Sequence, residues 1–119
     1  MRISEIKSML AETGLPVTYE AWQEHGVPQL PYIVWIMPNS DNFKADDRVY
    51  KEVEELYVEL YTMRREFGTE QVVEAVLNAH GIVWEKQSVR IDAENENETI
   101  YTAEVLIEPE AMEEESNGE

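Results

Sequence analysis

Residues 32–37, with the sequence YIVWIM, form a continuous apolar run between Pro31 and Pro38. An apolar run of this length with helix breakers at both ends is typical of a strand that is buried on both faces. A helix would need more residues than the two prolines leave free. The sequence therefore predicts a buried strand here, and the rest of the chain must cover it.

Two segments have the spacing of amphipathic helices. The first covers residues 3–13 and is expected to end at Gly14, with Pro16 just beyond. Its predicted buried face holds Ile3, Ile6, Met9 and Leu10.

The second predicted helix covers residues 69–80. Thr69 is a good N-cap, Glu70 lies in the first turn where the helix dipole favours an anion, and Gly81 is a favourable residue after the helix end. The predicted buried stripe is Val72, Val73, Val76 and Leu77.

Two further segments alternate as strands do. Residues 82–92 and 99–107 have this pattern, and the polar residues 93–98 between them indicate a hairpin connection. In the second segment, Ile100, Thr102, Glu104 and Leu106 are expected to face opposite to Tyr101, Ala103, Val105 and Ile107. A weaker alternation over residues 17–22 allows a strand, whereas residues 38–47 (PNSDNFKADD) have the composition of a loop.

Residues 49–63 fit two patterns. A helix would place Val49, Val53, Leu56 and Leu60 on one face, whereas in a strand Leu56, Val58 and Leu60 alternate with Tyr57, Glu59 and Tyr61. Periodicity alone does not decide, but the aromatic and β-branched residues from 56 to 62 favour the strand. The resulting order, α-β-β-α-β-β, predicts one α+β domain over residues 1–107, a mostly antiparallel sheet with two helices packed on it.

The chain is strongly acidic, since 26 Asp and Glu residues against 9 Lys and Arg residues give a net charge of −17. No basic residue follows Arg90, and residues 108–119 contain six glutamates and little to bury. We therefore expect residues 108–119 to be a disordered acidic tail. Removing those six charges from −17 leaves −11, so the body of the protein is acidic as well.

This charge argues against a nucleic-acid binder, which needs clustered Lys and Arg, and against docking on anionic lipid. No apolar run reaches the roughly 18–20 residues that a membrane helix needs. Glu5 and Glu12 interrupt the N-terminal stretch where a signal peptide would be apolar, and the chain has no cysteine. We expect a soluble, intracellular domain.

Catalytic and metal-binding patterns are missing from the sequence. His25 and His80 are the only histidines, no serine lies in a GxSxG motif, and the five glycines are scattered singly. Asp41, Asp46 and Asp47 collect oxygen ligands in one loop, but the spacing does not match an EF-hand, and a solvated loop with Asx turns is favoured. We expect no enzyme, no cofactor and no bound metal.

The aromatic residues suggest a contact surface. Trp35 and Trp84 lie within predicted strands and are expected in the core. Tyr57 and Tyr61 share one face of residues 49–63, and an exposed strip of this kind would suit protein–protein contact. It is equally well expected that helices and loops cover both faces of residues 49–63, so that neither tyrosine is exposed.

The order of several short peptides resembles that of a family of small phage proteins. These peptides are LPYIVW, NFKADDRVY, ELYVELYT, NAHGIVWEK and TIYTAEVLI, and the likeness covers roughly residues 10–107. In this order they resemble the tail terminator (tail completion, or head–tail joining) proteins of long non-contractile-tailed phages and prophages of Gram-positive bacteria. The glutamate-rich segment after Ile107 lies outside the resemblance.

The resemblance implies a virion protein without cofactor or catalysis. It would be assembled in the host cytoplasm as a hexameric ring on the head-proximal end of the tail tube, where it would stop tube polymerisation. Its partners would be copies of itself, the tail tube protein and the head connector or stopper protein, with no membrane. DNA would pass through the lumen without specific binding, and an acidic body suits this because it repels phosphate. The resemblance also supports a strand over residues 49–63.

A ring contact is heterologous, so one surface of the subunit must complement a different one on its neighbour. We expect Phe43, as an apolar anchor, and Lys44, as a cation, to contribute to it. The full set of predicted interface residues is Asp41, Phe43, Lys44, Asp46, Tyr57 and Tyr61. Two alternatives remain open, namely an acidic DNA mimic that inhibits a host DNA-binding protein, and another head–tail connector piece such as a stopper.

Overall fold

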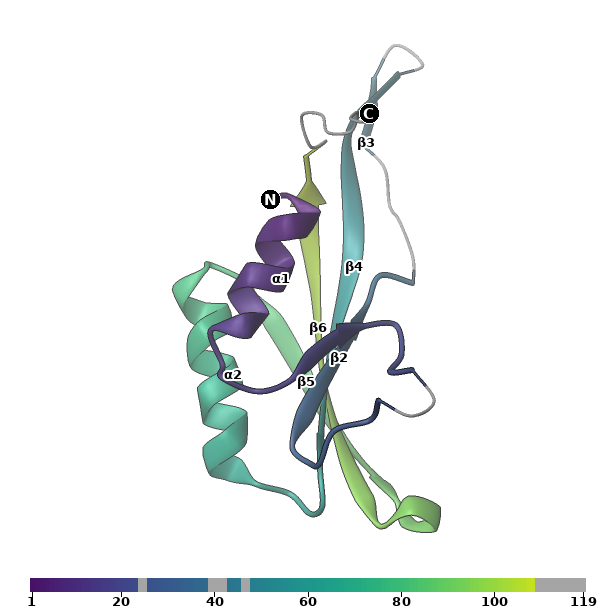
Figure 1. The fold of residues 1–119 in the computed structure, drawn as a ribbon. Helices are drawn as coiled ribbons and strands as arrows, with labels where there is room; N and C mark the ends of the chain where they lie inside the picture. The colour runs from purple at the N-terminus through teal and green to yellow at the C-terminus, as the bar shows by residue number, and fades with distance from the viewer. Residues whose placement is uncertain (24–25, 39–42, 46–47, 109–119) are drawn as a thin grey trace.

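The computed structural model describes residues 1–23, 26–38, 43–45 and 48–108. In this part of the chain, two helices and six strands follow one another (Figure 1). They are α1 (Ile3–Ala11), β1 (Val17–Tyr19), β2 (Tyr32–Ile36), β3 (Phe43–Ala45), β4 (Arg48–Thr62), α2 (Phe67–Ala79), β5 (Trp84–Ile91) and β6 (Glu96–Ile107), with a short 3₁₀ turn at Asp92–Glu94. Among the described residues, no helix is long and apolar enough to cross a bilayer.

The main sheet has the strand order β1-β2-β4-β6-β5, and β3 pairs with β4 outside that path. β1 and β2 are parallel, and every other pair is antiparallel. The predicted α+β class with a mostly antiparallel sheet is therefore confirmed, and two short strands, β1 and β3, add to the predicted order.

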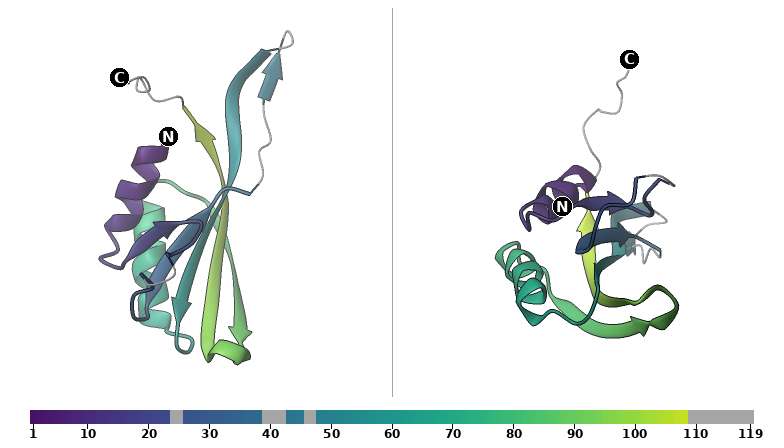
Figure 2. Two further views of the ribbon diagram at one scale, coloured as in Figure 1. Left: turned by 45° about the vertical axis from the view of Figure 1, so that its right-hand side comes forward. Right: turned by 60° about the horizontal axis from the view of Figure 1, so that its bottom comes forward.

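Both helices cover the same face of the sheet, which we call the inner face (Figure 2). The middle inner positions of β2, β4 and β6 are apolar and buried, and they pack against the buried faces of α1 and α2. The main members of this core are Ile6, Leu10, Ile33, Trp35, Leu56, Val58, Leu60, Val73, Leu77 and Tyr101. We call the opposite face of the sheet, away from the helices, the outer face.

The ambiguous residues 49–63 form a strand. β4 places Leu56, Val58 and Leu60 on the inner face, each at most 1% exposed. It is the central strand of the sheet, and its residues 57–61 pair with β2 on one side and with β6 on the other. The predicted alternation in β6 is also confirmed, because Tyr101 is buried on the inner face while Leu106 is 47% exposed.

The second helix begins earlier than predicted. Its N-cap is Glu66, and the Thr69 hydroxyl donates to a Glu66 carboxylate oxygen at 2.8 Å, so Thr69 is not the cap. Val72 is 45% exposed, and Val73 and Leu77 carry the buried stripe. The stripe is rotated relative to the prediction because Glu70 occupies its third buried position.

The prediction of a loop over residues 38–47 is wrong in part. Phe43–Ala45 forms β3, which pairs with the start of β4. The local composition favours turns, but pairing with β4 gives these residues cross-strand hydrogen bonds that composition does not reveal.

The two ends of the described chain lie together. The Met1 ammonium donates to the Leu106 carbonyl at 2.8 Å, and the Glu108 amide donates to the Met1 carbonyl at 2.9 Å. The start of α1 is thus fastened to the end of β6. Apart from Glu108, the predicted acidic tail falls outside the described residues.

Candidate interaction surfaces

The first predicted interface segment lies on a two-stranded arm. Residues 48–51 of β4 precede the part of the strand that pairs with β6, and their pairing partner is β3. The arm therefore extends past the edge of the main sheet, as Figure 1 shows at the top. Phe43 and Lys44 belong to β3, whereas Asp41 and Asp46 lie outside the described residues.

The second predicted segment lies elsewhere on the same strand. Tyr57 and Tyr61 occupy the outer face of β4, where they pair with Ile36 and Tyr32 of β2. Six residues separate Lys51 in the arm from Tyr57, which in a strand is about 20 Å. The structure thus distributes the predicted interface residues over two separate surfaces that β4 connects.

The outer face carries a cluster of one tyrosine and two glutamates. The Tyr61 hydroxyl lies 3.1 Å from Glu59 Oε1 and 3.0 Å from Glu98 Oε2. A hydroxyl has one proton to donate, so it can satisfy only one of the two carboxylates as a donor. Burial, and then the nearby charge of Glu98, raise the pKa of the Glu59 carboxyl. Burial, with both carboxylates beside it, raises the pKa of the Tyr61 hydroxyl.

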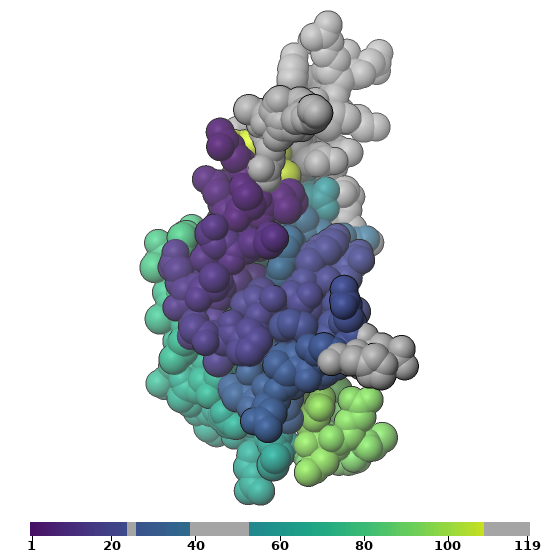
Figure 3. Space-filling view, in the orientation of Figure 1, coloured from purple at the N-terminus to yellow at the C-terminus, as the bar shows by residue number. Residues whose placement is uncertain are grey.

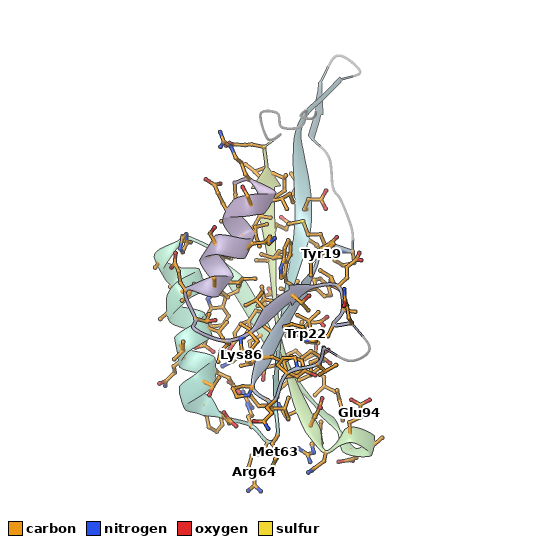
Figure 4. All side chains as sticks on the ribbon, in the orientation of Figure 1. Tyr19, Trp22, Met63, Arg64, Lys86 and Glu94 are labelled. Atoms are coloured by element: carbon orange, nitrogen blue, oxygen red, sulfur yellow. The ribbon has the colours of Figure 1, made fainter. Side chains whose placement is uncertain are left out.

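Aromatic rings cover part of this face. The Tyr32 and Tyr61 rings have centroids 5.3 Å apart, and Trp22 meets Tyr32 edge-on at 5.6 Å. Trp22, which Figure 4 labels, belongs to the segment between β1 and β2, and its ring lies against Tyr32. Tyr57 and Tyr61 are both partly buried, so they are neither fully exposed nor fully covered.

The charged residues at the outward positions of the sheet are acidic. Glu55 and Glu104 are direct cross-strand partners on this face, and Glu98 and Glu85 lie on it in β6 and β5. Among the described residues from 53 to 107, no Lys or Arg occupies an outward position of the sheet. The outer face is thus one of the acidic surfaces of the body.

A groove of about 820 Å³ lies between α1 and the β1–β2 edge of the sheet. Its walls are mainly apolar, with Ile3 and Ala11 on the α1 side and Val17, Tyr19 and Trp35 on the strand side. The Tyr19 and Trp35 rings are 4.6 Å apart, and Tyr19 remains 46% exposed. Lys7 is the charged residue of the lining. Figure 3 shows the side of the molecule on which α1 and these strands lie.

Sequence reasoning missed a buried ionic cluster under α2. Glu70 is 1% exposed, and its carboxylate lies 3.1 Å from Arg65 Nε and 3.1 Å from Lys86 Nζ. These contacts lower the pKa of the Glu70 carboxyl although burial opposes the shift. The spacing of Glu70 with Val73 and Leu77 was the available signal, because it places the carboxylate on the buried face of the helix.

The structure offers no metal centre among the residues it describes, where no three His, Asp or Glu side chains converge. His80 Nε2 lies 3.1 Å from Glu12 Oε1, which links the end of α2 to α1. His25 lies outside the described residues. Glu85 and Lys86 point to opposite faces of β5, as their adjacency requires, with Lys86 bonded to Glu70 and Glu74.

No protein-family model matches this chain, and no curated protein matches it. Among solved structures, the chain is similar to one described as "Virion of native gene transfer agent (GTA) particle". The identity is 13%, the TM-score is 0.58, and the match covers 85% of this chain and 84% of that chain. At this identity the likeness shows a shared fold, and it extends over most of both chains.

Proposed function

We propose that this chain is a structural component of a phage or phage-derived particle, and that it acts as a tail terminator. In this role it caps the head-proximal end of the tail tube as a homohexameric ring, stops polymerisation, and joins the tail to the head connector. The observation that carries the proposal is the fold shared with a virion chain over 85% of this chain. The peptide pattern from LPYIVW to TIYTAEVLI supports the finer assignment.

Two surfaces of the subunit suit a ring. A heterologous contact requires two different complementary surfaces, and the β3–β4 arm is well separated from the outer face around Tyr61. The proposed subunit contact uses the arm, with Phe43 as its apolar anchor and Lys44 as its cation. Each copy is strongly acidic, so apolar burial at this contact has to exceed the repulsion between copies.

A connector piece such as a stopper is the nearest alternative, and it shares the proposed location but uses other surfaces. An acidic DNA mimic is the alternative from another class. The carboxylates of Glu85, Glu98 and Glu104 on the outer face favour it, because a mimic needs negative charge spread over one surface.

The test is deletion of the gene from the phage or prophage that encodes this chain, followed by electron microscopy of the particles. A terminator predicts tails of uncontrolled length that are not attached to heads, and a plasmid copy should restore joined particles. Tails of normal length beside heads that lose their DNA would instead identify a stopper. Particles of normal shape and number would overturn a structural role altogether.

Removal of residues 108–119 distinguishes a tail terminator from an acidic inhibitor of a DNA-binding protein. A terminator lacking these residues should still restore joined particles, because the peptide resemblance ends at Ile107. An inhibitor that acts through its charge should lose affinity for its target, together with the salt dependence of that affinity.

A further inference from the structure

The groove between α1 and β1 is an apolar surface without cover among the described residues. Tyr19 and Ile3, which line it, are 46% and 38% exposed. The volume of about 820 Å³ is within the range of pockets that hold ligands or peptide segments. The groove therefore has room for several residues of an extended peptide.

The charge of the groove sets the kind of peptide that fits it. Lys7 lies in the lining, and no carboxylate of the described residues makes an ion pair with its ammonium. A peptide that offers one flexible apolar side chain followed by carboxylates would fill the apolar walls and pair with Lys7. Methionine suits such a groove because its thioether adapts to irregular space and packs well against aromatic rings.

The chain itself supplies a peptide of this kind close to the groove. Residues 109–119 contain five glutamates and no basic residue, and Met112 comes directly before Glu113, Glu114 and Glu115. The segment starts next to α1, because Glu108 is hydrogen-bonded to Met1. Four extended residues from Glu108 to Met112 span about 13 Å, whereas Ile3 and Lys7 are about 6 Å apart along the helix. The segment is therefore long enough to reach the Ile3–Lys7 side of the groove.

We propose that the C-terminal segment of each chain docks in its own groove, with Met112 against Tyr19 and Trp35 and the following glutamates beside Lys7. The segment has too little apolar surface to fold alone, but a groove that is already built removes that requirement. The docked segment covers the apolar walls and neutralises the cation. This contact goes beyond the proposed virion role and does not depend on it.

The test uses the full chain with ¹³C-labelled methionine methyl groups. The chain has five methionines, so the Met112 signal is assigned by its loss in Met112→Ala. We expect nuclear Overhauser effects between this methyl and the rings of Tyr19 or Trp35. Lys7→Glu should weaken them about two- to fivefold, as the loss of one exposed ion pair allows. Arg64→Glu, a charge reversal at the other end of the molecule (Figure 4), should leave them unchanged.

A Met112 methyl at its random-coil position, without contacts to the rings, would overturn the proposal. So would contacts seen only in mixed samples of differently labelled copies, since they would assign the groove to a second molecule. Contacts that persist undiminished in Lys7→Glu would overturn the charge pairing. The particle-assembly assay above has a separate readout, so failure of this contact and failure of the virion role are distinguishable.

Discussion

The ammonium of Lys86 lies 3.1 Å from the Glu70 carboxylate, and this contact ties the edge strand β5 to the first turn of α2. Arg65, just before the helix, contacts the same carboxylate, and Thr99 of β6 approaches it at 3.4 Å. One buried charge therefore joins three elements. Arg65 and Lys86 are partly exposed, whereas Glu70 is buried. Their two positive charges let the Glu70 carboxylate stay ionised under the helix.

Glu70→Gln should destabilise the fold by about 1–3 kcal/mol at pH 7, because it weakens two charge-assisted hydrogen bonds, while Lys86 keeps its contact with Glu74. Glu85→Gln is the matched control, since Glu85 is exposed on the strand that carries Lys86, and it should change stability by less than about 0.5 kcal/mol. Urea unfolding followed by tryptophan fluorescence measures both. Equal effects of the two substitutions would show that the buried cluster contributes nothing particular.

The pH dependence of this effect has a defined sign. The folded state lowers the pKa of the Glu70 carboxyl, so its stabilisation is complete above the unfolded pKa of about 4.3 and declines as the pH falls through the folded value. The difference between wild type and Glu70→Gln should therefore shrink on acidification below about pH 4. A difference that stays constant from pH 7 into the acid range would contradict the assigned pKa shift.

Glu59→Gln should act in the opposite direction. The pKa of Glu59 is raised in the folded state, so its ionisation opposes folding as the pH rises through that value. An amide at this position still accepts from the Tyr61 hydroxyl and can donate to Glu98. We expect a gain of about 0.5–1 kcal/mol at neutral pH that disappears in acid, when the wild-type carboxyl is protonated. A loss of stability at neutral pH would refute the like-charge interpretation.

Substitution of two leucines tests the assignment of residues to the inner and outer faces of the sheet. Leu60 is 0% exposed under the helices, and Leu60→Ala should cost about 2–5 kcal/mol through lost burial and a cavity. Leu106 on the outer face is 47% exposed, and Leu106→Ala should cost less than about 1 kcal/mol. Thermal unfolding of the two variants checks this, and a reversed order would mean that the strand register is wrong.

The sequence was sufficient to predict a strand where its hydrophobic pattern fitted only one type of secondary structure. The apolar run at residues 32–37 and the alternation in residues 99–107 became β2 and β6, because core burial admits only one register for each. The sequence was insufficient where pairing with another strand determined the secondary structure of a segment. Phe43–Ala45 is a strand because the long β4 extends beyond the sheet beside it, and no local signal in residues 38–47 announces that.

The candidate surfaces were predictable only in part, for a related reason. Tyr57 and Tyr61 were placed on one face correctly, since the period of a strand fixes this. The approach of Glu98 to Tyr61 depends on a pairing across 37 residues of sequence, which spacing within one segment cannot reveal. Glu70 looked like a first-turn anion, and only the helix packing turned it into a buried one.

Phe43→Ala tests the role of the β3–β4 arm. We expect an unchanged melting temperature, because Phe43 belongs to a strand that pairs with the part of β4 outside the main sheet. In the proposed role we also expect the number of joined particles to fall at least about tenfold. The reason is that loss of a buried aromatic anchor at an interface costs about 2 kcal/mol or more of binding free energy. The matched control is Val83→Ala, because Val83 is 86% exposed and should leave assembly unaffected. Full particle yield from the Phe43→Ala gene would exclude Phe43 as an interface anchor.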